Sequence, residues 1–88
     1  MRVQFRQSFT RDLRKLPSPD LLVRIKALIE QVEAAARLDD LPHLKKLAGG
    51  AGHYRVRLGD FRIGLEVERD LVTFVRVLHR KEIYRYFP

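Results

Sequence analysis

Three arginine side chains gather on one face of a predicted β-hairpin. Two stretches of alternating apolar and polar residues are separated by Gly59 and Asp60, a pair that favours a two-residue type II′ turn. In that register Arg57 lies directly across from Arg62, with Arg55 beside them on the face opposite the apolar residues. Like charges placed opposite each other repel, and guanidinium groups bind phosphate oxygens in fork-like pairs. The spacing therefore predicts a shallow phosphodiester-binding patch, the alternative being an exposed face of solvated side chains.

Further side chains that could take part in catalysis or binding flank this hairpin in the sequence. His79, Arg80 and Tyr84 follow the last predicted strand, where a chain leaving the sheet could bring an imidazole, a cation and a phenol to the arginine patch. Lys45 and Lys46 precede the hairpin and add positive charge. The alternatives are a surface histidine and a solvated basic loop.

The same register makes other cross-strand pairs. Arg55 faces Gly64, which has no side chain to block the approach of a ligand, and His53 faces Glu66 in a pair that could be purely structural. The turn that follows the second strand is less well defined. A shift of one residue there decides whether Arg76 joins the polar face.

The N-terminal third of the sequence predicts elements that can support such a hairpin. Residues 1–6 alternate with the period of a half-buried strand. A short helix capped by Ser8 follows through Leu16. Ser18 and Pro19 then form a start signal for a second helix, with a capping hydroxyl and a proline at the first helical position.

The remaining residues complete one compact domain. Apolar residues recur at helical spacing over 21–36, and residues 38–52, rich in proline, aspartate and glycine, are predicted to be a connecting loop. The hairpin and a stretch over 71–78 bring the number of predicted strands to four, and residues 81–87 form a short helical turn. The pattern predicts a single α+β domain over 1–88.

Composition narrows the classes of function. The 88 residues carry a formal charge of +7 and no cysteine, which excludes disulfides and thiolate metal sites. The positive electrostatic field of such a charge attracts phosphate polyanions, although it would also attract an acidic protein or membrane headgroups. No signal peptide, membrane span, P-loop, dinucleotide motif or metal-ligand spacing is present, so we expect a cytoplasmic protein that needs no cofactor and no metal.

Three segments together resemble the RelE/ParE toxin superfamily: Leu44–Gly49, Tyr54–Ile63 and Val77–Tyr84. The order of elements matches across nearly the whole chain. The resemblance implies a RelE-like fold, with two N-terminal helices packed on one face of a twisted, mainly antiparallel sheet. It also implies a neutralising antitoxin and, for RelE-like members, metal-independent cleavage of mRNA in the ribosomal A site by attack of the ribose 2′-hydroxyl.

The resemblance also assigns roles by position. Arg55 and Arg57 match the two basic residues of the family's second strand, where RelE itself has lysine. A guanidinium is a poor general base, so His79 becomes the preferred proton-transfer group, and we expect His79→Ala to lose activity with folding intact. The predicted catalytic residues are Arg57, Arg62, His79, Arg80 and Tyr84, and the predicted RNA-binding residues are Arg55, Lys45 and Lys46.

Three functions fit this resemblance. The leading hypothesis is a ribosome-dependent mRNA endonuclease whose partners are the ribosome, mRNA and an antitoxin. The first alternative is a ParE-like poison of DNA gyrase that does not cut RNA, and the second is an inactive toxin fold that acts in autoregulation, binding operator DNA only through its antitoxin. In each case we expect an acidic or amphipathic antitoxin that covers the basic face or the N-terminal helices, and no membrane partner.

Overall fold

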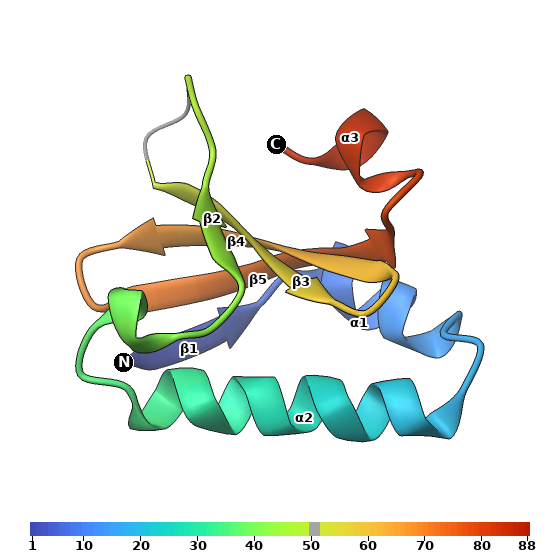
Figure 1. Cartoon of the computed structure of the whole chain (residues 1–88), viewed down its shortest axis with the longest axis horizontal. Coiled ribbons are helices and arrows are strands. Elements are labelled where there is room, and N and C mark those ends of the chain that lie inside the picture. The colour runs from blue at the N-terminus through green and yellow to red at the C-terminus, as the bar shows by residue number, and fades with distance from the viewer. Residues whose placement is uncertain (50–51) are drawn as a thin grey trace.

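A computed structural model, which describes residues 1–49 and 52–88, shows a twisted sheet with helices on both sides (Figure 1). The strand order is β1-β5-β4-β3-β2, and only the β1–β5 pair is parallel. The strands are β1 (Arg2–Phe5), β2 (Leu44–Lys46), β3 (His53–Leu58), β4 (Phe61–Glu68) and β5 (Leu71–His79). The helices are α1 (Gln7–Arg14), α2 (Pro19–Ala34), the 3₁₀ turn η1 (Leu38–Asp40) and α3 (Ile83–Tyr86).

The α+β prediction is confirmed, with five strands in place of four. The additional strand is β2, which lies in the segment predicted to be a loop and pairs antiparallel with the outer edge of β3. Its three residues are too few to show a period in the sequence, and they become a strand because β3 offers them unpaired backbone groups.

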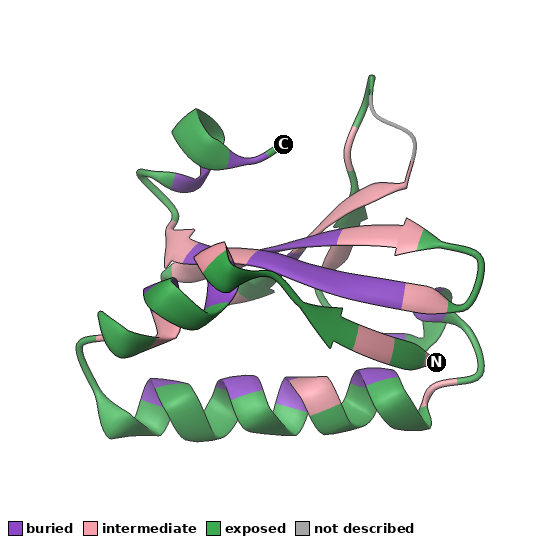
Figure 2. Cartoon of the chain, turned by 180° about the vertical axis from the view of Figure 1, so that it is seen from behind, coloured by how far each residue is buried: buried purple, intermediate pink, exposed green. Residues whose placement is uncertain are grey.

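The long helix α2 covers one face of the sheet. Its start is as predicted: the Ser18 hydroxyl accepts the backbone N–H of Leu21 at 3.3 Å, and Pro19 occupies the first helical position. Figure 2 shows buried residues along the side of α2 that faces the sheet. The shared core contains Phe9 from α1 and the following residues of α2 and the sheet: Leu21, Ile25, Leu28, Val32, Val56, Ile63, Leu65, Val72, Phe74 and Val77.

Helix α1 protects the edge of the sheet that β1 leaves open. β1 pairs only with the first four residues of β5, so the rest of that edge carries unpaired backbone groups. The prediction that Ser8 caps α1 was wrong: its hydroxyl donates to the carbonyl of Val75 at 2.6 Å, and the N-cap is Arg6 without a side-chain bond. The Asp12 carboxylate accepts the backbone N–H of Val77 at 3.0 Å.

Asp12 also fixes the position of Arg76. The two side chains form a two-pronged ion pair, with Nε–Oδ2 at 2.8 Å and Nη2–Oδ1 at 3.0 Å, and the Asp12 residue is only 6% exposed. This hydrogen-bonded carboxylate raises the pKa of Arg76 above its ordinary value. The Tyr86 ring lies against the same guanidinium, 4.9 Å from its central carbon. Arg76 is thus a structural cation tied to α1.

The hairpin register is as predicted. Arg57 pairs with Arg62, Arg55 with Gly64, and His53 with Glu66. Gly59 has a φ of +61°, as the first central residue of the predicted turn requires.

The predicted C-terminal helical turn is present as α3, and it folds back on the face of the sheet opposite α2. Ile83 and Phe87 are buried there against Val75, and the Phe87 ring lies over the bare backbone of Gly64. A Cβ atom at Gly64 would lie 2.6 Å from that ring.

We therefore expect Gly64→Ala to lower the free energy of unfolding by about 1–3 kcal/mol, because the added methyl group displaces Phe87. Urea denaturation of the wild-type and variant proteins measures the difference. An unchanged midpoint would mean that the ring is not seated on Gly64.

Candidate functional site

A groove rich in arginine runs along the side of the hairpin that faces away from α2. Two adjoining hollows, of about 290 and 510 Å³, share His43, Arg57 and Arg62 and form one open depression. We call this depression the basic groove. Its lining residues are Arg24, His43, Leu44, Lys45, Arg55, Arg57, Leu58, Gly59, Asp60, Arg62 and Arg80.

Neutral acceptors hold the two arginines at the centre of the groove. Arg62 Nη1 donates to the carbonyls of Gly59 at 2.8 Å and Phe61 at 2.9 Å, so the side chain curls back over the hairpin turn. Arg57 Nη2 lies 3.1 Å from Nδ1 of His43. Neither contact neutralises a charge, and both guanidinium groups therefore keep their full attraction for an anion.

The outer arginines of the groove are also weakly compensated. The guanidinium of Arg55 lies over the ring of Tyr84, 4.7 Å from its centroid, and Tyr84 is 70% exposed. Arg80 Nε is 4.0 Å from a carboxylate oxygen of Asp60, while its backbone N–H donates to the Asp60 carbonyl at 2.8 Å. The backbone contact places Arg80 beside the hairpin turn.

Four arginines elsewhere on the molecule have closer carboxylate partners. Their ion pairs are Arg2–Asp70, Arg6–Glu66, Arg37–Asp39 and Arg76–Asp12, at 2.8–3.4 Å. The exposed pairs contribute little to stability, but they lower the local positive field. In the basic groove, by contrast, several arginines lie together with no carboxylate of the described residues closer than 4.0 Å, and their combined charge can attract a polyanion.

The structure does not bring His79 into this groove. His79 pairs with Phe61, and successive side chains of a strand point to opposite faces, so it lies on the other side from Arg62. Its ring meets Phe61 edge-on at 5.7 Å, and its Nδ1 accepts the backbone N–H of Lys81 at 3.2 Å. His79 instead lines a separate hollow beside α1.

The two predicted RNA-binding lysines lie on opposite faces of β2. Lys45 pairs with Arg55 and lines the groove, whereas Lys46 pairs with Tyr54, whose side chain packs on the core cluster at the opposite face. Of the predicted residues, the groove thus contains Arg55, Arg57, Arg62, Arg80 and Lys45, with Tyr84 at its margin.

The sequence analysis did not identify two residues that line the groove, His43 and Arg24. His43 directly precedes β2, and without that strand it could not be placed beside the hairpin. Arg24 belongs to the polar side of α2, yet it reaches past the edge of the sheet: its Nη1 is 3.3 Å from the position that a Cβ at Gly59 would take. No pattern in the sequence links either residue to the arginines.

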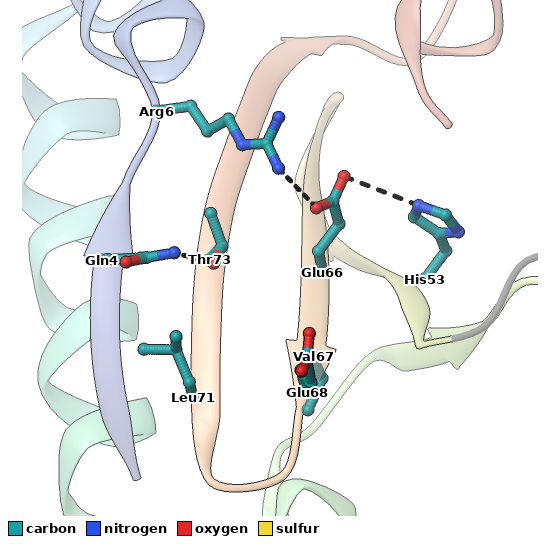
Figure 3. Close-up of a pocket in the computed structure, with 8 residues that line it drawn as sticks. All are labelled: Gln4, Arg6, His53, Glu66, Val67, Glu68, Leu71 and Thr73. Atoms are coloured by element: carbon teal, nitrogen blue, oxygen red, sulfur yellow. Dashed lines mark hydrogen bonds and ion pairs between the residues drawn. The ribbon is translucent and has the colours of Figure 1, made fainter.

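A second polar hollow lies on the same face of the sheet, near β1 (Figure 3). Glu66 occupies its centre and contacts Arg6 at 2.8 Å. The predicted cross-strand pairing of His53 with Glu66 is confirmed, but the 3.6 Å between His53 Nε2 and the Glu66 carboxylate is too long for a hydrogen bond. The Gln4 amide donates to the Thr73 hydroxyl at 2.8 Å. Here the charges are paired with one another, in contrast to the basic groove.

Within residues 1–49 and 52–88, no three histidine, cysteine or acidic side chains gather in a way that could hold a metal ion. No helix in this part of the chain is long and apolar enough to cross a membrane.

Comparison with known proteins places this geometry in context. The model of a family described as ParE toxin of type II toxin–antitoxin systems matches residues 3–84. The toxin RelE3 of Methanocaldococcus jannaschii is 45% identical over 89 residues, an alignment that covers both proteins in full.

Solved structures show the same fold. The RelB–RelE antitoxin–toxin complex of Methanococcus jannaschii contains a chain with a TM-score of 0.82 and 42% identity, covering 96% of this chain and 98% of that one. The RelE–RelB complex of Pyrococcus horikoshii gives a TM-score of 0.74 at 23% identity, with 90% and 93% coverage, and supports the fold alone.

Proposed function

This chain belongs to the RelE/ParE superfamily of toxins from type II toxin–antitoxin systems, and we propose that it inhibits translation by cutting mRNA on the ribosome. The observation that carries the proposal is the basic groove, where Arg57 and Arg62 face each other and neither forms an ion pair with a carboxylate among the described residues. A phosphodiester bound between them would relieve their repulsion and accept hydrogen bonds from both guanidinium groups.

The groups in the groove suit cleavage by the RNA's own 2′-hydroxyl. In that reaction the 2′-oxygen bonds to phosphorus as the bond to the 5′-oxygen breaks. The 2′-oxygen loses one proton and the departing oxygen gains one, which leaves a 2′,3′-cyclic phosphate and a 5′-hydroxyl. Negative charge grows on the phosphate oxygens in the transition state, so fixed cations at Arg57, Arg62 and Arg80 would stabilise that state more than the bound substrate.

Membership of this toxin superfamily also leads us to expect an antitoxin partner. The related toxins of M. jannaschii and P. horikoshii were solved in complex with RelB. We propose that a cognate antitoxin neutralises this chain and that its acidic or amphipathic segment covers the basic groove or helices α1 and α2. Operator DNA would be bound only through that complex, and ribosome, mRNA and toxin would meet in the cytoplasm.

The direct test adds purified protein to a reconstituted translation reaction and maps mRNA 5′ ends by primer extension. New ends that require ribosomes support the proposal. Cuts in naked mRNA would instead indicate a free ribonuclease. A folded sample that makes no cuts under either condition would refute the proposed function.

Gyrase is the second candidate target, because the matching family model is that of ParE toxins. A supercoiling assay with purified gyrase distinguishes the two. Inhibition of gyrase together with intact mRNA would favour the ParE-like activity and leave the arginines without a catalytic role.

Tyr84 offers a test of how the groove holds RNA. Its exposed ring, backed by Arg55, presents a surface on which a base can stack. We expect Tyr84→Ala to lower the rate of cleavage by about 10-fold or more, since stacking contributes about 1–3 kcal/mol per base. Primer extension over a time course measures the rate.

Tyr84→Phe separates the ring from its hydroxyl. A rate near that of the wild type would assign the effect to stacking, whereas a loss as large as in Tyr84→Ala would assign it to the hydroxyl. Full activity in Tyr84→Ala would place RNA elsewhere.

A further inference from the structure

His43 occupies an unusual backbone position beside the basic groove. Its φ is +61°, in the left-handed region that residues other than glycine enter rarely and at a cost. His43 and Arg69 are the two such non-glycine residues among those that the structure describes. Arg69 lies in the two-residue turn between β4 and β5, whereas His43 directly precedes the edge strand β2.

This conformation directs two groups of His43 toward the same partner. Its carbonyl accepts the backbone N–H of Arg57 at 3.1 Å, and its Nδ1 lies 3.1 Å from Nη2 of that arginine. A guanidinium has no acceptor, so Nδ1 must carry the lone pair and Nε2 the proton. A hydrogen bond at this contact therefore requires the tautomer of His43 that carries its proton on Nε2.

Arg57 needs such a restraint. It is exposed and stands directly across from Arg62, and because like charges in that position repel, conformations that bring both guanidinium groups together in the groove are disfavoured. A carboxylate could also hold the Arg57 side chain, but it would neutralise the positive charge that attracts the phosphate. The imidazole holds the guanidinium and leaves that charge intact.

We infer that His43 is a positioning residue: it holds Arg57 in the basic groove so that the guanidinium is already ordered when a phosphodiester arrives. This inference rests on the proposed function for its substrate, RNA. His43 acts through Arg57, because ordering a long side chain in advance removes an entropy cost from binding and from the transition state.

Two substitutions separate the imidazole from the backbone. Glycine adopts a positive φ without strain, so His43→Gly removes the side chain alone. Asparagine tolerates the left-handed region, and its Oδ1, bonded to Cγ like the Nδ1 of histidine, can accept the same hydrogen bond. We expect H43G to lower the single-turnover rate of mRNA cleavage by about 10-fold and H43N to stay within about 3-fold of the wild type.

A double-mutant cycle with R57A tests whether His43 acts through Arg57. In the R57A background H43G should cause no further loss, because the side chain that it orders is gone. Equal losses from H43G in both backgrounds would overturn the inference, as would an H43N protein as slow as H43G. Arg14→Ala, which removes an exposed arginine on α1, is the control for loss of charge.

A measurement on the free protein keeps the inference separate from the proposed function. Two-bond ¹H–¹⁵N spectra of labelled histidine report the imidazole tautomer, and we expect the Nε2–H form for His43. A proton on Nδ1 would overturn the inference whatever the activity. If the expected tautomer is found but neither the wild type nor any variant cuts mRNA, the proposed function fails while the contact stands.

Discussion

Replacing Arg62 by alanine should lower the rate of ribosome-dependent mRNA cleavage by about 10²–10³-fold, the usual cost of removing a fixed group that stabilises transition-state charge. Arg62 lies at the centre of the basic groove and is shared by both of its hollows. Its guanidinium is already ordered by the carbonyls of Gly59 and Phe61, so its charge is available to substrate without rearrangement. Primer extension in the reconstituted translation reaction measures the rate.

Two further variants sharpen this test. Arg62→Lys keeps the charge but cannot form the fork of parallel hydrogen bonds, so it should recover only part of the lost rate. Arg14→Ala removes an equal charge from an exposed position on α1, away from the basic groove, and should cleave mRNA at the wild-type rate. The assignment of Arg62 would be excluded by full activity in Arg62→Ala, with its fold verified by circular dichroism.

Asp12→Ala should be the most destabilising of the substitutions considered, lowering the free energy of unfolding by about 2–4 kcal/mol. The Asp12 side chain is 6% exposed and accepts both prongs of the Arg76 guanidinium and the backbone N–H of Val77. Its loss leaves a buried N–H on the edge of β5 without an acceptor and Arg76 without its counter-ion. The 22% exposure of Arg76 lets water replace part of that interaction, which keeps the loss below that of a fully buried pair.

Asp12→Asn separates the contribution of the hydrogen bond to Val77 from that of the ion pair with Arg76. The amide oxygen can still accept the Val77 N–H, but it carries no charge for Arg76, so we expect about half the loss seen with alanine. Urea denaturation followed by circular dichroism gives both values. A loss below about 1 kcal/mol for Asp12→Ala would mean that this carboxylate does not hold α1 against the open edge of β5.

The hairpin and the start of α2 could be predicted from the sequence because both depend on neighbouring residues. A two-residue turn at Gly59 fixes which side chains of β3 and β4 face each other, and the alternation of apolar residues fixes which face is polar. The pairing of Arg57 with Arg62 follows from these two local rules. In the same way Ser18 and Pro19 define the first turn of α2.

The side on which His79 lies was decided by the tertiary structure. β5 has an irregularity opposite Gly64 and Leu65, where the pairing skips Val75. One extra residue reverses the alternation of side chains beyond it. In an unbroken strand His79 would point to the arginine face, whereas after the bulge it pairs with Phe61 on the opposite one. The bulge has no sequence pattern of its own.

The sequence by itself thus determined the α+β class, the cross-strand arginine pair and the concentration of positive charge, since these depend on periodicity, one turn and composition. Only the tertiary structure decided the rest of the groove. β2 forms because the edge of β3 is open to it, and that pairing brings His43 from a distant loop to within hydrogen-bonding distance of Arg57. Contacts between residues far apart in the chain depend on how the elements pack, and local patterns do not encode them.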